Sequence, residues 1–136
     1  MSMTDSQLFN TACDAMKKAY APYSECYVGA ALVCDDGSVY TGCNIENAAF
    51  TPGICAERTA ISKAVSEGKR KFTKIMVVGG KDGVIKGTFP PCGVCRQVLR
   101  EFCDDDFEVM FGVSEDNIEH HTMKEILPFS FSSKDM

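Results

Sequence analysis

The sequence predicts an α/β fold in which helices cover both faces of a central sheet. An amphipathic segment near the start is followed by a hairpin signal, and helical and strand-like segments then alternate towards the end. The chain has 136 residues, of which 45 % are hydrophobic and 24 % are charged, as is typical of a globular domain with a sizeable core. We therefore expect a single domain over residues 1–136.

The first helix is predicted from apolar residues at helical spacing. Thr4 or Asp5 can cap it, and Pro22 should end it near Tyr20. A short connection follows. Asp36 and Gly37 then stand between two apolar runs, which indicates a β-hairpin.

A polar loop over residues 44–53 then leads into a second helix. Short strands follow, the first of which should be buried on both faces. The expected elements are, in chain order, a helix from about residue 4 to 20, strands Val28–Cys34 and Val39–Cys43, a helix over Ala56–Ser66, a strand Ile75–Val78, a helix over Gly93–Cys103, a strand Glu108–Val113, a weaker strand near His120 and a short helix over Met123–Leu127.

The charge balance limits the choice of partners. A net charge of -5 argues against a surface built for nucleic acid, because phosphate contacts need clustered Lys and Arg. The densest basic run, Lys69–Lys71 with Lys74, is interpreted as a solvated turn, and Asp104–Asp106 as a polar helix end. No apolar run approaches the roughly 18 residues that span a bilayer, and no secretory leader is visible. We expect a cytoplasmic protein with no membrane or nucleic-acid partner.

Eight cysteines in such a chain are more typical of metal ligands or reduced core thiols than of disulfides. Cys92 and Cys95 have the spacing of a metal-binding pair, and Cys55 can supply a third thiolate. Four other cysteines lie in apolar segments and are interpreted as core thiols: Cys13, Cys34, Cys43 and Cys103.

Cys55 and Cys92 each stand where a helix is predicted to begin. That position favours a thiolate, because free N–H groups and the positive end of the helix dipole oppose its charge. Three thiolates would leave the fourth zinc position open, as in catalytic sites, and Glu57 can place an acid/base carboxylate there. Because Zn²⁺ with three thiolates carries excess negative charge, we expect a compensating cation, Arg58 rather than Arg96.

Each feature also has a less specific interpretation. A lone Cys-x-x-Cys pair can be a redox motif or half of a closed structural zinc site, although no second such pair exists here. The only histidines, His120 and His121, lie in a polar segment and are expected to be exposed. Glu57 can merely be a favourable residue in the first turn of a helix, and Arg58 and Arg96 can be surface residues.

The pattern Cys55-Ala56-Glu57 followed by Pro91-Cys92-x-x-Cys95 resembles the zinc-dependent nucleoside deaminases. The chain as a whole resembles the short, homotetrameric type of cytidine deaminase. Six stretches fit in order: Ala19–Ser24, Val28–Leu32, Gly42–Ala48, Cys55–Ala60, Pro91–Gln97 and Leu127–Ser133. Six matches in register are more specific than either zinc motif alone.

The resemblance implies a three-layer α/β/α sandwich around a central mixed sheet of about five strands. It also implies one Zn²⁺ per chain, held by Cys55, Cys92 and Cys95. The implied reaction is hydrolytic deamination of cytidine and 2′-deoxycytidine to uridine and 2′-deoxyuridine plus ammonia, in pyrimidine salvage. Glu57 would carry protons between water, N3 of the base and the leaving amine.

The same resemblance implies a substrate site. Asn44 and Glu46 would hydrogen-bond the ribose, and the backbone around Ala56 would receive the pyrimidine carbonyl. Phe131 would complete the active site of an adjacent subunit in a homotetramer. The alternatives are that Asn44 and Glu46 form a self-capping loop and that Phe131 is a core aromatic of its own chain.

Two positions depart from the pattern. Cys26 stands where a phenylalanine usually packs against the base, so we expect another ring to compensate: Tyr27, Phe50, or Phe131 of a neighbouring subunit. Phe50 stands where tyrosine is common, which puts any hydroxyl contact there in doubt.

The sequence leaves three other functions open: a deaminase of a modified cytosine nucleoside such as a blasticidin-type antibiotic, a polynucleotide or tRNA deaminase, and a small zinc-stabilised binding module. The loop over residues 44–47 favours a plain ribose. The acidic charge and the short chain oppose a polynucleotide substrate. Release of ammonia from cytidine would exclude the binding module.

Overall fold

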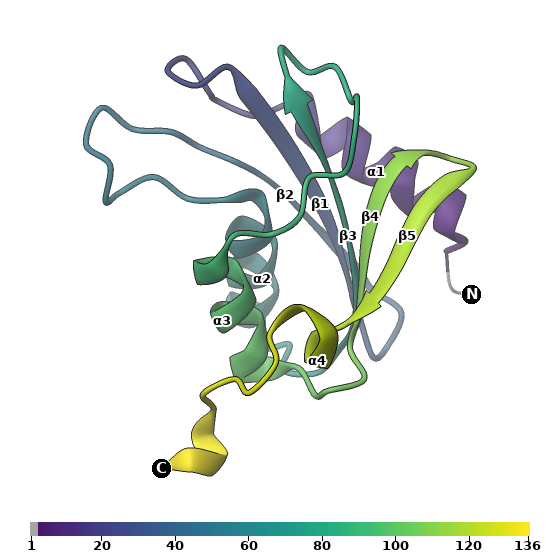
Figure 1. Ribbon diagram of the computed structural model, residues 1–136, viewed down its shortest axis with the longest axis vertical. Helices are drawn as coiled ribbons and strands as arrows, with labels where there is room; N and C mark the ends of the chain where they lie inside the picture. The colour runs from purple at the N-terminus through teal and green to yellow at the C-terminus, as the bar shows by residue number, and fades with distance from the viewer. Residues whose placement is uncertain (1–2) are drawn as a thin grey trace.

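Residues 3–136, which the computed structural model describes, fold into five strands and four α-helices (Figure 1). The elements are α1 (Asp5–Met16), β1 (Cys26–Cys34), β2 (Val39–Cys43), α2 (Ala56–Ser66), β3 (Phe72–Lys81), α3 (Gly93–Phe102), β4 (Glu108–Ser114), β5 (Asn117–Thr122), α4 (Met123–Ile126) and a 3₁₀ turn, η1 (Ser133–Asp135). The strands form one sheet in the order β2-β1-β3-β4-β5. Neighbouring strands are antiparallel except β3 and β4, which are parallel, so the sheet is mixed.

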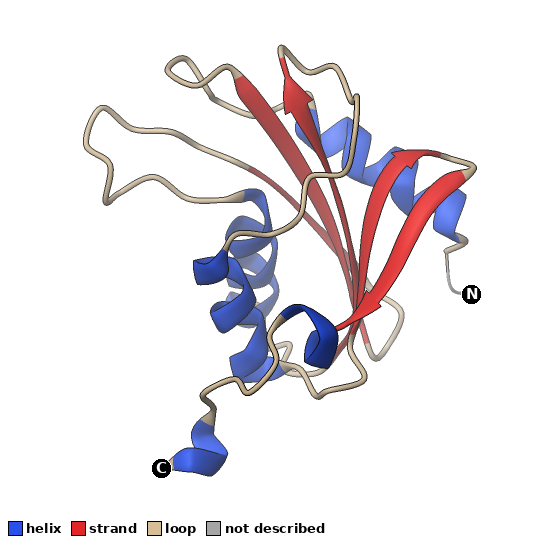
Figure 2. Ribbon diagram, in the orientation of Figure 1, coloured by secondary structure: helices blue, strands red, loops and turns tan. Residues whose placement is uncertain are grey.

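Helices cover both faces of this sheet, as Figure 2 shows. On one face α1 packs through residues such as Leu8 against Met76 and Met110 of the strands. On the other face α2 and α3 pack through Ile61 and Leu99. Because apolar residues alternate between the two faces of each strand, β3 is buried on both sides. The predicted three-layer α/β/α sandwich around a five-stranded mixed sheet is confirmed.

The first helix begins where the sequence predicted but ends earlier. Thr4 is its N-cap, and the helix stops at Met16 rather than near Tyr20. The backbone of Tyr20 bonds elsewhere: its N–H donates to the carbonyl of Asn44 at 3.0 Å, and its carbonyl accepts from Glu46 at 2.8 Å. Pairing with a distant segment has therefore replaced the last helical turn, and it anchors the loop that carries Asn44 and Glu46.

Strand β3 is longer than the predicted Ile75–Val78 and continues through Gly79 and Gly80. Glycines weaken a strand signal, yet both of these pair with β1. The following loop lies so close that a Cβ on Gly79 would come within 2.9 Å of the Phe89 ring, and one on Gly80 within 2.0 Å of the Val84 carbonyl oxygen. The two glycines thus allow the loop over residues 82–92 to lie directly on the sheet.

Helix α2 lies equally close to β2 at Gly42. A Cβ at that position would come within 2.3 Å of the carbonyl oxygen of Ala56 and 2.5 Å of the backbone nitrogen of Ala60. These are backbone atoms, so the helix cannot yield without moving as a whole. The contact fixes the first turn of α2 and therefore the position of Cys55, its N-cap.

The cysteines interpreted as core thiols differ in burial. Cys34 and Cys103 are buried, and burial raises the pKa of Cys103 to about 12. Cys13 and Cys43 are only half-buried, which corrects the prediction for these two. Cys43 lies at the end of β2, an edge strand, and Cys13 lies at the margin of the contact between α1 and the sheet.

The two histidines also differ in their exposure to solvent. His120 is exposed on β5 and contacts Asp5 at 3.3 Å and Glu108 at 2.5 Å. His121 is half-buried and stacks on Phe111 with ring centroids 4.9 Å apart, so the prediction of exposure was wrong for it. Alternation along the strand places the two neighbouring rings on opposite faces of the sheet.

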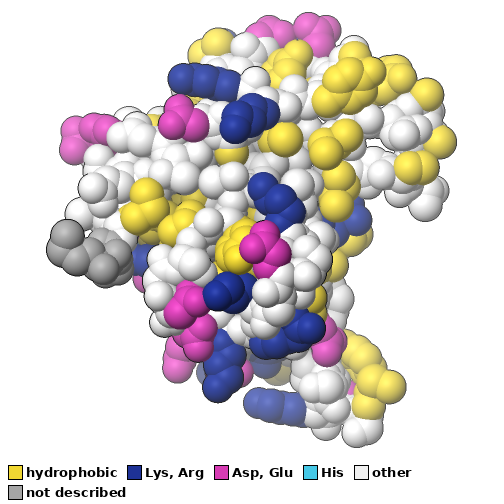
Figure 3. All heavy atoms as spheres, turned by 180° about the vertical axis from the view of Figure 1, so that it is seen from behind, with side chains coloured by type: hydrophobic (Ala, Val, Ile, Leu, Met, Phe, Trp, Pro, Cys, Tyr) yellow, Lys and Arg dark blue, Asp and Glu magenta, His cyan; other side chains and the backbone are white. Residues whose placement is uncertain are grey.

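The charged runs behave as ordinary surface. Lys69 pairs with Asp36 at 2.6 Å, and Arg70 donates to the carbonyl of Val65 at 2.8 Å, at the end of α2. Asp105 pairs with Arg100 at 2.7 Å beyond the end of α3. Acidic and basic side chains are interspersed on the face that Figure 3 shows.

Within residues 3–136, no helix has the length and apolar character that crossing a membrane requires.

Candidate metal centre and substrate cavity

Three sulfur atoms come together from the N-termini of two helices. Cys55 is the N-cap of α2, Cys92 is the N-cap of α3, and Cys95 lies in the first turn of α3. Neither N-cap side chain makes a capping hydrogen bond to the backbone of its own helix, so both sulfurs can turn towards each other. The three Sγ atoms lie within 4.8 Å of one another and form the only such metal-ligating group within residues 3–136.

The sulfur positions fit a tetrahedral metal ion. The Sγ atoms of Cys55 and Cys92 are 3.7 Å apart. Two thiolates bound to one zinc ion at about 2.3 Å lie about 3.8 Å from each other in tetrahedral geometry. Thiolates are ligands that zinc favours, and three of them leave one tetrahedral position without a protein sulfur. The structure therefore brings together the three cysteines that the sequence predicted as ligands.

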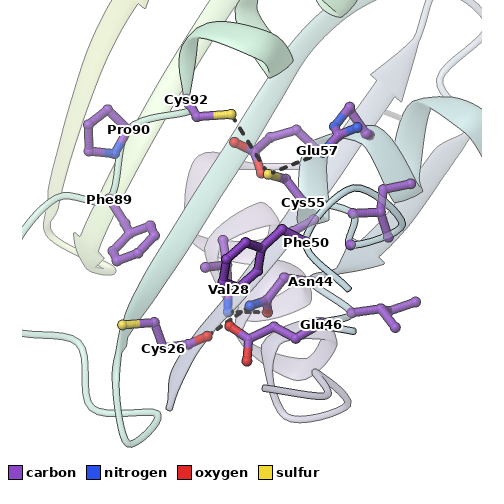
Figure 4. A pocket seen from close by; sticks show the side chains of 15 residues that line it. Cys26, Val28, Asn44, Glu46, Phe50, Cys55, Glu57, Phe89, Pro90 and Cys92 are labelled. Atoms are coloured by element: carbon purple, nitrogen blue, oxygen red, sulfur yellow. Dashed lines mark hydrogen bonds between the residues drawn. The ribbon is translucent and has the colours of Figure 1, made fainter. Parts of the chain in front are cut away.

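Glu57 lies in the first turn of α2, near the sulfurs of Cys55 and Cys92 (Figure 4). Its side chain is 3 % exposed, and it is the only buried charged residue within residues 3–136. Burial, with the Cys55 thiolate as a smaller cause, raises the pKa of Glu57 to about 7. A carboxyl group of that pKa can both take up and release a proton near neutral pH, as a general acid/base must.

A cavity of about 360 Å³ opens beside Glu57 and the sulfurs. That volume lies within the range of small-molecule sites, about 300–1,000 Å³. Asn44 and Glu46 line it as well, and in Figure 4 they stand at the opposite end from Cys92. Ala56 is a further lining residue, so the backbone that was predicted to receive a carbonyl borders the cavity.

Asn44 is braced by strand β1. Its side-chain oxygen accepts the N–H of Val28 at 2.9 Å, and its nitrogen donates to the carbonyl of Cys26 at 2.8 Å. A carboxamide has two N–H groups and two acceptor lone pairs, so one hydrogen and one lone pair remain available. The alternative interpretation, a self-capping loop, therefore does not describe how this side chain is held.

Glu46 is fixed by the segment that follows residue 22. Its carboxylate accepts the N–H groups of Tyr23 at 3.0 Å and Ser24 at 3.1 Å, together with the hydroxyl of Ser24. The Ser24 hydroxyl, followed by its backbone N–H, lowers the pKa of Glu46. Glu46 thus presents a charged acceptor to the cavity that it lines.

Comparison with known proteins places this site in a family. Residues 2–111 match the family model described as "Cytidine and deoxycytidylate deaminase zinc-binding region". The chain belongs to the cytidine and deoxycytidylate deaminase family. Zinc is the metal of this deaminase domain, and the cluster of three cysteines is the group that could hold it.

Individual deaminases resemble the chain over nearly its whole length. The cytidine deaminase of Halalkalibacterium halodurans is 46% identical over 134 residues, covering 98% of this chain and 98% of that protein. The cytidine deaminase of Sporosarcina psychrophila is 46% identical over 122 residues, covering 90% of this chain and 87% of that protein. The crystal structure of cytidine deaminase from Burkholderia pseudomallei matches with a TM-score of 0.87 at 42% identity, covering 95% of this chain and 100% of that one.

In this deaminase the charge of the sulfurs is opposed by Arg58, whose Nη2 donates to Cys55 Sγ at 3.8 Å. A hydrogen bond from the Cys95 thiol, and a smaller one from Arg58, lower the pKa of Cys55 to about 5. The same bond raises the pKa of Cys95, and Cys55 raises the pKa of Arg58. Cys55 therefore has thiolate character that suits it to bind zinc.

Arg96, the second candidate cation, serves a different purpose. Its Nε donates to the carbonyl of Pro91 at 2.8 Å, and its Nη1 donates to the carbonyl of Ile126 at 2.7 Å. It therefore ties the turn before Cys92 to the end of α4.

The structure separates the rings that were predicted to compensate for Cys26. Cys26 lines the deaminase cavity, but Tyr27, its neighbour on β1, packs with the core on the α1 face and cannot contribute. Phe50 lines the cavity but is 97% exposed on its loop. Phe131 is 61% exposed and does not line the cavity of its own chain, so the interpretation as a core aromatic was wrong.

One aromatic residue of the cavity lining was missed in the sequence. Phe89 lines the cavity from the loop that leads to α3 and packs against the core beneath α2 and α3. The run Phe-Pro-Pro before Cys92 is typical of a loop, and nothing in its spacing says where the ring points. An aromatic residue three positions before a metal ligand is the only signal that could have drawn attention to it.

Proposed function

We propose that this chain is a zinc-dependent cytidine deaminase, which hydrolyses cytidine and 2′-deoxycytidine to uridine and 2′-deoxyuridine and releases ammonia. The observation that carries the proposal is the cluster of three sulfurs with the buried carboxyl group of Glu57 beside it, at one end of a nucleoside-sized cavity. Relatives named cytidine deaminase that cover nearly the whole chain support it.

In the proposed reaction Cys55, Cys92 and Cys95 hold the zinc. When bound, zinc supplies Lewis acidity that allows water to act as a nucleophile near neutral pH. Glu57 accepts a proton from that water and delivers it to N3 as oxygen bonds to C4 of the base. Glu57 then moves the remaining proton of that water from the oxygen on C4 to the amino group, the C4–N bond breaks as the C4 carbonyl forms, and ammonia leaves. Because burial excludes solvent from the Glu57 carboxyl group, the protons stay between this side chain and the substrate.

The far end of the cavity is proposed to bind the sugar. The free amide hydrogen of Asn44 and the fixed carboxylate of Glu46 suit ribose hydroxyl groups, and the backbone at Ala56 suits the pyrimidine carbonyl. A carboxylate at the sugar would repel a phosphate group, which favours a free nucleoside over a nucleotide.

We also propose a homotetrameric, cytoplasmic enzyme of pyrimidine salvage that forms one domain over residues 1–136. The described part of that domain has a core on each face of a single sheet. All eight cysteines are free thiols, which suits a reducing compartment. Exposed aromatic side chains at Phe50, Phe129 and Phe131 suit contacts between subunits.

The direct test is to follow loss of cytidine absorbance and release of ammonia with purified protein of known zinc content. We expect one zinc per chain, activity that a strong chelator abolishes, and recovery when zinc is added back. Zinc-loaded protein that leaves both cytidine and deoxycytidine intact would overturn the proposal. A substrate panel that includes a blasticidin-type nucleoside checks the alternative, which the relatives' names do not favour.

A further inference from the structure

We propose that Phe89 is the ring against which the pyrimidine packs, so that the loop before α3 supplies the aromatic wall of the cavity in place of strand β1. The inference rests on the proposed function and names the residue that recognises the base.

The cavity has two aromatic side chains in its lining, Phe50 and Phe89. Phe50 is 97% exposed, so packing within the chain does not fix its ring. Phe89 is half-buried and packs against the hydrophobic core. Of the two rings, Phe89 is therefore the one whose position is set before a ligand arrives, and such preorganisation favours binding.

The backbone around Phe89 explains how its ring is held. The ring lies directly over Gly79, where even a methyl group would come within 2.9 Å of it. Pro90 and the fully buried Pro91 follow, and each proline ring restricts the backbone. At the start of the loop, the N–H of Asp82 donates to the carbonyl of Glu25 at 2.7 Å. The loop is thus fixed at both ends, with Phe89 held between the sheet and the cavity.

Cys26 leaves space for this arrangement. Its side chain also lines the cavity, and in Figure 4 the ring of Phe89 stands between Cys26 and Cys92. A thiol is far smaller than an aromatic ring, so β1 presents no flat surface of its own here. Phe89 therefore provides the aromatic contact that Cys26 cannot.

A flat pyrimidine can stack on, or meet edge-to-face, a phenylalanine ring. Such a contact is made to the substrate, to the product and to the states between them. An interaction of equal strength in the ground state and the transition state lowers KM without changing kcat. Phe89 is therefore expected to govern KM and the affinity for uridine, while the rate of the bound complex depends on Glu57.

The test measures uridine binding by calorimetry and cytidine kinetics for the zinc-loaded protein. Phe89→Leu keeps an apolar side chain but removes the ring, and it should raise the dissociation constant of uridine and KM about two- to tenfold with kcat nearly unchanged. Phe89→Tyr keeps the ring and should stay near wild type. Val84→Ala, in the same loop but outside the cavity lining, is the matched control and should change neither value.

If Phe89 only held Cys92 in place, Phe89→Leu would lose zinc and thermal stability together with its affinity for uridine. Zinc content and melting temperature are therefore measured for each variant. A second variant moves the ring. Cys26→Phe combined with Phe89→Leu should recover most of the affinity that Phe89→Leu loses.

Unchanged uridine affinity in a zinc-loaded Phe89→Leu variant would overturn the inference, as would equal losses in the Leu and Tyr variants. These outcomes are distinct from a failure of the proposed function, in which the zinc-loaded wild-type protein would not convert cytidine at all.

Discussion

At the scale of single residues, the proposed mechanism assigns every proton transfer to one buried carboxyl group, that of Glu57. Glu57→Gln keeps the size of the side chain but cannot carry a proton. We expect kcat for cytidine to fall by several orders of magnitude, since positioned proton transfer contributes about 10²–10⁴-fold in a single step. Steady-state absorbance assays of cytidine would measure the fall in kcat.

The same variant should retain zinc and fold, because no sulfur ligand has changed and a neutral amide relieves the cost of burying a charge. Zinc content and the melting temperature are the controls. A Glu57→Gln protein that turns over cytidine at nearly the wild-type rate would remove Glu57 from the mechanism.

A second prediction at this scale concerns the effect of Arg58 on the pKa of Cys55. In zinc-free protein Cys55 has a pKa of about 5, partly because the Arg58 guanidinium stabilises its thiolate. Arg58→Gln removes that cation, so the pKa of Cys55 should rise. The rate at which iodoacetamide alkylates Cys55, followed by mass spectrometry, should then rise to its plateau at a higher pH than in wild type.

Arg70→Gln is the matched control, since that guanidinium lies at the other end of α2 and donates to the carbonyl of Val65. It should leave the alkylation of Cys55 unchanged. If Arg58→Gln also leaves it unchanged, Arg58 does not balance the charge of the cluster.

The site residues that could be predicted are those whose relative positions are set by their spacing in the sequence. The spacing of Cys92 and Cys95, and of Cys55 and Glu57, is set within a single helical turn, so their chemistry is visible in the sequence. Phe89 was not predictable because its role depends on Gly79, a residue of another element whose missing side chain provides the space.

At the scale of elements, the position of α2 against β2 depends on Gly42. Gly42→Ala would place a methyl group 2.3 Å from the carbonyl oxygen of Ala56, which lies next to Cys55. Overpacking of this kind costs about 1–3 kcal/mol. We expect a lower free energy of unfolding in urea and, because the start of α2 must shift, a lower affinity for zinc in competition with a chelator.

Gly87→Ala serves as the control, because a Cβ there would meet nothing within 4 Å. It should leave unfolding and zinc affinity near wild type. Equal stability and zinc affinity for Gly42→Ala and the wild-type protein would show that α2 does not depend on this contact.

The starts of the helices were easier to predict than the ends of the other elements. Thr4 and the two N-cap cysteines mark where helices begin through local backbone requirements. The end of α1 depends on bonds between Tyr20 and the distant loop at Asn44, and the end of β3 depends on pairing of two glycines with β1. These are tertiary interactions, which override local preference.

At the scale of the whole molecule, the C-terminal tail remains poorly packed on its own chain. Phe129 and Phe131 are exposed, and in Figure 1 the tail extends away from the sheet. Figure 3 shows hydrophobic side chains exposed among polar and charged ones on the face seen from behind. The sequence could indicate an aromatic tail, but a single chain cannot reveal which partner covers it. A second copy of the chain is the proposed answer.

Mixed tetramers test whether Phe131 completes a neighbouring site. At cytidine concentrations well below KM, Phe131→Ala should be slower than wild type because each site lacks the neighbour's ring, and Glu57→Gln should be inactive because each site lacks its acid/base. When the two variants are co-expressed with different tags and the mixed species is purified, some sites combine an intact Glu57 with an intact Phe131 from the other chain. Cytidine deamination should therefore recover to a measurable fraction of the wild-type rate per tetramer.

The control is co-expression of Phe131→Ala with the Glu57→Gln/Phe131→Ala double variant. This mixture offers no intact ring and should recover nothing. Equal rates in the two mixtures would mean that Phe131 acts within its own chain or not at all.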